Sequence, residues 1–103
     1  MAYLLEKERT YFGKKEFIEV TVYAVPESVY FPQGLKYSLN YIRGGECILR
    51  YDNEKGKSHH VHFEGKELNV EFPGMEELKK EFGDKVAKIR GDFHESEERN
   101  NKD

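Results

Sequence analysis

Residues 35–43 carry the clearest pattern in the chain, an alternation of apolar and polar side chains with a period of two. Leucine or tyrosine occupies positions 35, 37, 39 and 41, and polar residues lie between them. Such a period is typical of a β-strand with one apolar and one polar face. Gly44-Gly45 predicts a tight turn, after which residues 46–52 alternate again as the second strand of a hairpin. The two predicted faces of this second strand are Cys47, Leu49 and Tyr51 on one side and Ile48, Arg50 and Asp52 on the other.

Four further segments have the pattern or composition of strands and are bounded by turn residues. Successive strands joined by short turns predict an antiparallel meander. The four predicted strands are residues 4–11, 16–25, 58–63 and 68–72, and the predicted turns are residues 12–15, 53–57 and 64–67.

A different period begins after Pro73-Gly74, where apolar residues recur at helical spacing. This pattern predicts an amphipathic helix that ends near Gly91. Gly83 lies inside the pattern and leaves open whether the helix is split into two. Residues 92–103 contain few apolar side chains and predict a disordered, acidic tail. The apolar positions of the helix are Met75, Leu78, Phe82, Val86 and Ile89.

Together these elements predict one α+β domain over residues 1–91, followed by the tail of residues 92–103. The domain is an antiparallel β-meander sheet of about five to six strands, packed on one face by the C-terminal amphipathic helix. A chain of 103 residues is large enough for one core but too small for a deep cavity. We therefore expect any functional site to be a groove or the polar face of the sheet.

Composition and charge bear on the partners, the source and the cellular compartment of the protein. The formal net charge is −3, and residues 92–103 account for it with five acidic and two basic residues, which argues against a non-specific DNA coat. Glu and Lys dominate the charged residues, a bias typical of hyperthermophile proteins, and this suggests a thermophilic source. The lone Cys47 excludes an intrachain disulfide and is expected to be a core thiol in a reducing compartment. Without an apolar run of about 18 residues, we expect a cytoplasmic protein with no membrane partner.

Three of the four histidines lie within residues 50–62. On a strand, His60 and His62 share one face, and the preceding strand brings Arg50 or Asp52 beside them if the register allows. Two imidazoles and a cation suit acid–base cleavage of RNA without a metal. An H-x-H pair with Asp52 also suits zinc or another divalent ion. A third interpretation is a polar, histidine-rich hairpin with no chemical task.

An ordered series of short motifs resembles the TumE-like toxins of toxin–antitoxin systems. The series covers roughly residues 34–90 and consists of K-Y-x-L at 36–39, R-Y-D-N at 50–53, G-K at 56–57 and H-x-H at 60–62. Ser58 stands where the family pattern has Gly, His59 where it has Asp, and Ser38 where it has Arg. If the family's Asp orients a histidine, Asp52 is the residue left to replace it here.

The resemblance implies a cytoplasmic toxin neutralised by a cognate antitoxin, commonly a small helix-turn-helix protein. The residue types fit an endoribonuclease, with His60, His62 and Asp52 as catalytic candidates. We expect no cofactor, while a divalent metal at His60 and His62 stays open. Other positions that match the family motifs are candidates for substrate binding. They are Lys36, Tyr37, Arg50, Tyr51, Asn53 and Lys57.

Two alternatives belong to other functional classes. One is a non-enzymatic module that blocks a ribosomal or protein target through Tyr37, Tyr51 and a basic rim. The other is a small metal-binding domain. Exposed strand edges at residues 4–11 or 68–72 would also allow a homodimer.

Overall fold

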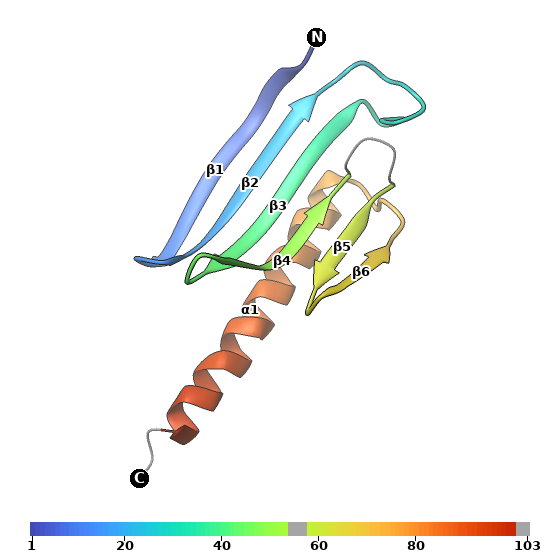
Figure 1. The fold of residues 1–103 in the computed structure, drawn as a ribbon. Helices are drawn as coiled ribbons and strands as arrows, with labels where there is room; N and C mark the ends of the chain where they lie inside the picture. Colours follow the sequence, from blue (N-terminus) through green and yellow to red (C-terminus); the bar gives the residue numbers. More distant parts are fainter. Residues whose placement is uncertain (54–57, 101–103) are drawn as a thin grey trace. The chain divides into compact units, whose positions relative to one another are not determined.

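The computed structural model describes residues 1–53 and 58–100 of the chain, with side chains up to residue 93. This described part contains six strands and one helix (Figure 1). The elements are β1 (Tyr3–Gly13), β2 (Glu16–Ala24), β3 (Leu35–Arg43), β4 (Glu46–Asp52), β5 (His60–Phe63), β6 (Lys66–Asn69) and α1 (Met75–Asn100).

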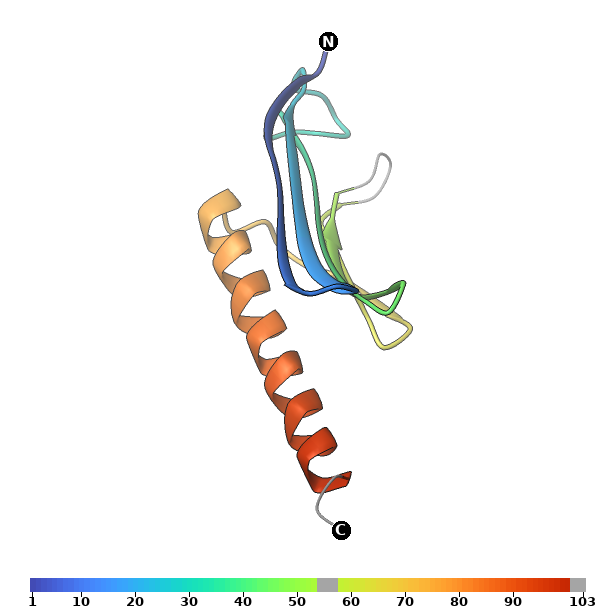
Figure 2. The same cartoon turned by 90° about the vertical axis from the view of Figure 1, so that its left-hand side faces the viewer.

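The six strands form one antiparallel sheet in the order in which they occur along the chain. This order confirms the predicted α+β fold with an antiparallel meander. Turned to the side in Figure 2, the strands are seen as one thin, curved layer. β1 and β6 are the two edges of the sheet, so β2, β3, β4 and β5 each have neighbours on both sides.

The register of the central strands separates an apolar from a polar face. Leu39 lies opposite Tyr51 and Asn40 lies opposite Arg50, so the alternating patterns of β3 and β4 are in phase. Paired residues of an antiparallel sheet point to the same side. The side chains buried on the apolar face are Val22, Tyr37, Leu39, Tyr41, Leu49, Tyr51 and Val61.

Cys47 is exposed, so its expected place in the core is wrong. The register shifts by one residue after Tyr41, which pairs with Leu49, because Ile42 pairs with Cys47. This bulge inserts Ile48 as an extra residue in β4. Cys47 is therefore moved from the face of Leu49 to the polar face.

The last hairpin differs from its prediction. The turn contains only Glu64 and Gly65, which have φ angles of 53° and 75°, and Phe63 pairs directly with Lys66. Two consecutive positive φ angles are typical of the two-residue turns whose twist matches that of a hairpin. The predicted four-residue turn was too long, so the sixth strand begins at Lys66 and ends at Asn69 instead of covering residues 68–72.

Helix α1 is unbroken from Met75 to Asn100, passing through Gly83 and Gly91. The helix end predicted near Gly91 is wrong, because residues after it are rich in Glu, which favours helix and offsets the cost of about 1 kcal/mol per glycine. Leu78, Phe82 and Val86 are buried, as the amphipathic pattern predicts. The boundary at residue 91, the disordered tail and the packing of the helix on the sheet stay predictions. Within the described residues, no helix combines the length and the apolar character that a membrane crossing requires.

The Glu64-Gly65 turn provides a matched pair of substitutions. Glu64→Asn is expected to raise the free energy of unfolding by about 0.5 to 1 kcal/mol, because Asn tolerates positive φ better than Glu. Gly65→Ala should lower it by about 1 kcal/mol, since alanine is strained at φ 75°. Urea denaturation measures both values, and a change of the same sign in the two variants would contradict this turn geometry.

Candidate functional site

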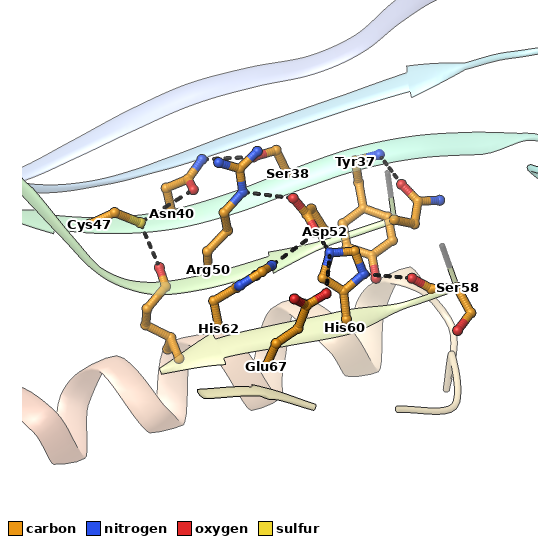
Figure 3. A network of polar contacts seen from close by, with 12 residues as sticks. Tyr37, Ser38, Asn40, Cys47, Arg50, Asp52, Ser58, His60, His62 and Glu67 are labelled. Carbon is orange, nitrogen blue, oxygen red and sulfur yellow. Dashed lines mark hydrogen bonds and ion pairs between the residues drawn. The ribbon is translucent and has the colours of Figure 1, made fainter. Parts of the chain in front are cut away.

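The polar face of the sheet carries a compact cluster on two neighbouring strands. Asp52 lies opposite His60, and Arg50 lies opposite His62, so all four side chains project to the same side (Figure 3). This confirms the prediction that the two histidines share a face and settles the register that was left open. β4 and β5 are consecutive strands and also neighbours in the sheet, so their pairing holds these four residues beside one another.

Asp52 is the centre of this cluster. Arg50 Nε donates a hydrogen bond of 2.7 Å to Asp52 Oδ2. The other carboxylate oxygen, Oδ1, lies 2.5 Å from His60 Nε2 and 4.0 Å from His62 Nε2. The His60 side chain has no exposed surface, whereas Arg50 and His62 expose 48% and 39% of theirs. The buried Asp52–His60 pair is therefore the floor of the site, and Arg50 and His62 are its accessible rim.

The orientation of His60 is fixed by the backbone. Its Nδ1 lies 2.7 Å from the carbonyl oxygen of Ser58. A carbonyl oxygen only accepts, so Nδ1 carries a proton and donates it. Nε2 then faces Asp52 Oδ1. Within the described residues, neither of these two buried atoms has a hydrogen-bond partner, although they lie so close together.

Glu67 of β6 extends the cluster and was missed in the sequence. It lies opposite His62, and its Oε1 is 3.7 Å from His60 Nε2. The signal that would have found it is the Glu-Gly pair at residues 64–65. A two-residue turn there places Glu67 directly opposite His62, whereas the longer predicted turn left it outside the sheet.

Two hollows flank Arg50 and Asp52, and these two residues line both. One has a volume of about 210 Å³ and also contains Lys36 and Ser38. The second, of about 430 Å³, contains His62 and Cys47. The rim of the site is thus open on both sides of the guanidinium group, which suits an extended ligand that crosses the sheet face.

Tyr37 and Tyr51 lie on the opposite face, away from this cluster, and both are buried. The Tyr37 hydroxyl is 2.8 Å from His59 Nδ1, and the rings of Tyr37, His59 and Phe72 all contact one another. Burial, followed by the charge of Asp52, raises the pKa of Tyr37 far above its usual value. The hydroxyl therefore stays protonated, and we infer that it donates to His59 Nδ1.

Asn53 joins the end of β4 to β3. Its Oδ1 accepts a hydrogen bond of 2.9 Å from the Tyr37 backbone, and its Nδ2 donates one of 2.7 Å to the Leu35 carbonyl. Its side chain thus continues the pairing of the two strands. Lys36 is exposed and lines the smaller hollow. Lys57 lies outside the described residues.

Two of the three departures from the toxin motif, Ser58 and His59, have local explanations. Ser58 contacts His60 through its backbone carbonyl, which a glycine would supply equally well. His59, at the position of the family's Asp, contacts Tyr37 and Phe72 on the apolar side. Within the described residues, orientation of His60 thus falls to the Ser58 carbonyl and Asp52.

A comparison with protein-family models finds a match over residues 4–90 to the family described as Toxin TumE. No curated protein and no solved structure matches the chain. The family match covers every described residue of the cluster and all six strands except the first residue of β1.

Asn53→Ala is expected to lower the free energy of unfolding by about 2 to 3 kcal/mol, because it leaves two backbone groups of β3 unpaired. The matched control is Asn40→Ala. The Asn40 amide donates to the Ser38 hydroxyl on the partly exposed polar face, so its loss should cost no more than about 1 kcal/mol. Chemical denaturation compares the two, and equal losses would contradict the assigned role of Asn53.

His59 makes stability depend on pH. Burial, with a smaller contribution from His60, lowers the pKa of His59 below 6.5. The unfolded chain then binds the proton more readily than the folded chain, so stability is complete above pH 6.5 and falls as the pH decreases. His59→Phe keeps the aromatic contacts and should reduce the fall in thermal midpoint between pH 7.5 and pH 5. These two pH values lie about one unit or more above and below the ordinary histidine pKa of about 6.5. An unchanged pH slope in the variant would contradict this assignment.

Proposed function

The chain belongs to the TumE toxin family, and on that premise we propose that it acts on RNA through the polar face of its sheet. Membership in this family makes it the toxin-like component of a toxin–antitoxin system and implies an antitoxin partner. The proposed target is the RNA phosphodiester backbone, and the proposed reaction is its cleavage. A cytoplasmic location and an antitoxin of the helix-turn-helix type are part of the same proposal.

One observation carries the proposal. An exposed guanidinium and an exposed imidazole stand over a buried carboxylate–histidine pair, between two open hollows. Arginine binds phosphate oxygens through several donors and stabilises charge that develops on them. Lys36 offers a second cation at the smaller hollow. An RNA strand that crosses Arg50 would meet His62 on one side and Lys36 on the other.

The buried position of His60 bears on the chemistry. Metal-independent cleavage by two imidazoles, as expected from the sequence, requires one ring to take a proton from the ribose and the other to give one to the leaving oxygen. His62 is accessible for such a transfer, but His60 has no exposed side-chain surface. His60 is therefore better suited to positioning Asp52 than to touching the substrate.

The alternative of a non-enzymatic binding module draws less support from the structure. It relies on Tyr37 and Tyr51 as contact residues, and both are buried on the apolar face. A homodimer through a strand edge stays a proposal. In β1, at one edge of the sheet, the side chains of Tyr3, Leu4 and Leu5 are each more than half exposed.

Arg50→Ala is expected to reduce RNA cleavage, and with it toxicity in cells, by about 100-fold or more, because the phosphate loses its principal cation. The chain offers a close control in Arg9→Ala. Arg9 lies on the same face, exposes 45% of its side chain and donates from Nε to Glu19, much as Arg50 does to Asp52. Arg9 lies on the edge strand β1, which β2 and β3 separate from β4, so its loss should leave RNA cleavage and toxicity nearly unchanged.

The assay maps the ends of RNA fragments produced by each purified variant, alongside growth of cells that express it. Cleavage by Arg50→Ala at the level of Arg9→Ala would contradict the proposed role of Arg50. Toxicity of the wild type without any cleaved RNA would contradict the proposed reaction and favour the binding module.

A further inference from the structure

The geometry points to a divalent transition-metal site formed by Asp52 Oδ1, His60 Nε2 and His62 Nε2. The probe ion for this site is Zn²⁺. The inference goes beyond the proposed action on RNA, because ion binding is a property of the folded chain alone. It rests on three independent features of the cluster: two unpartnered buried atoms, the convergence of three ligand atoms, and the contacts that hold the ligands from behind.

The first feature is the close approach of two lone pairs. Because His60 Nδ1 donates to the Ser58 carbonyl, a neutral His60 ring has its lone pair on Nε2. Nε2 faces Asp52 Oδ1 at 2.5 Å, and among the described residues neither atom makes a hydrogen bond. Two lone pairs so close together in a buried place repel each other unless a proton or a metal ion lies between them. A bound cation satisfies both atoms at once.

The second feature is the arrangement of the third ligand. His62 Nε2 lies 4.0 Å from the same carboxylate oxygen, and the three atoms lie within 4.8 Å of one another. Ligands bonded to zinc at about 2.0 to 2.1 Å in a tetrahedron are about 3.3 Å apart. The ion therefore requires the Asp52–His60 pair to open slightly and His62 to move inward. The exposed ring of His62 has room for that movement.

The third feature is the set of outer contacts. Ligating histidines usually donate their other ring N–H to a carbonyl or carboxylate, and ligating carboxylates are themselves hydrogen-bonded. His60 does so to Ser58, and the second oxygen of Asp52 accepts from Arg50. The positive charge of Arg50 opposes the binding of a cation nearby. However, the Arg50 side chain is half exposed and binds the Asp52 oxygen that is not a ligand, so solvent screens its repulsion of the ion.

The donor set indicates the class of ion. Two imidazole nitrogens and one carboxylate oxygen favour Zn²⁺ and similar transition metals over Mg²⁺ or Ca²⁺, which prefer oxygen ligands. Three protein ligands with an open position are typical of catalytic zinc sites, whereas structural sites have four. Glu67 lies at the edge of the cluster, 3.7 Å from His60 Nε2. If the protein cleaves RNA, an ion here would add a second positive charge at the phosphate beside that of Arg50, and cleavage would then fall in EDTA.

The test uses the full chain without a histidine tag, stripped with EDTA and titrated with ZnCl₂ in a calorimeter. We expect one Zn²⁺ per chain, an increase in thermal midpoint on binding, and affinity at least about tenfold weaker in His62→Gln. His62 is partly exposed, so this variant should fold, and circular dichroism checks that it does. The matched control is His59→Phe, which removes a neighbouring histidine from the opposite face and should leave zinc binding unchanged.

Uptake of less than about 0.1 equivalents of zinc by the wild type would overturn the inference, and so would unchanged affinity in His62→Gln. In that case the Asp52–His60 contact is a proton-mediated ion pair. The RNA proposal is tested separately, because cleavage that persists in EDTA retains that proposal while removing the ion from it. Zinc binding by a protein that cleaves no RNA would support the metal site and contradict the proposed reaction.

Discussion

The pairing of β4 with β5 is the constraint on which the rest of the site depends. It places Asp52 opposite His60 and Arg50 opposite His62, and thereby brings an acid, a cation and two imidazoles to one face. Because side chains alternate with a period of two, a slip of one residue would send the histidines to the apolar face and Val61 to the polar one. No single side chain creates the site. The register of two short strands does.

Residues on the other face and at the strand ends support this register. Tyr37, His59 and Phe72 form an aromatic cluster next to the start of β5, and Asn53 joins the end of β4 to the backbone of β3. The motif at residues 50–53 therefore has two roles that alternate along the strand. Arg50 and Asp52 belong to the cluster on the polar face, whereas Tyr51 and Asn53 hold the strand in place. A short run of conspicuous polar and aromatic residues need not all meet the substrate.

The central hairpin was predictable because residues 35–43 alternate strictly and its turn contains two glycines, although the bulge at Ile48 interrupts the alternation of β4. The last hairpin was harder, since a Glu-Gly turn with positive φ at a glutamate is unusual, and the error hid Glu67. The helix was identified by its apolar period, but its end was not, because Glu-rich sequence continues a helix past a glycine without any apolar signal. For the site, the sequence identified Arg50, Asp52, His60 and His62 but not Glu67. It did not show that Cys47 leaves the core or that His59 contacts Tyr37, because the bulge at Ile48 and the contacts of His59 are tertiary features.

The most direct measurement is the ring-nitrogen NMR spectrum of the histidines, recorded with and without Zn²⁺. We expect opposite tautomers for two adjacent residues. His60 should carry its proton on Nδ1, which donates to Ser58, and its Nε2 resonance should shift on addition of zinc. His59 should carry its proton on Nε2, because Nδ1 accepts from Tyr37, and its spectrum should not respond to the ion. A proton on His60 Nε2 that persists in the presence of zinc would contradict the account.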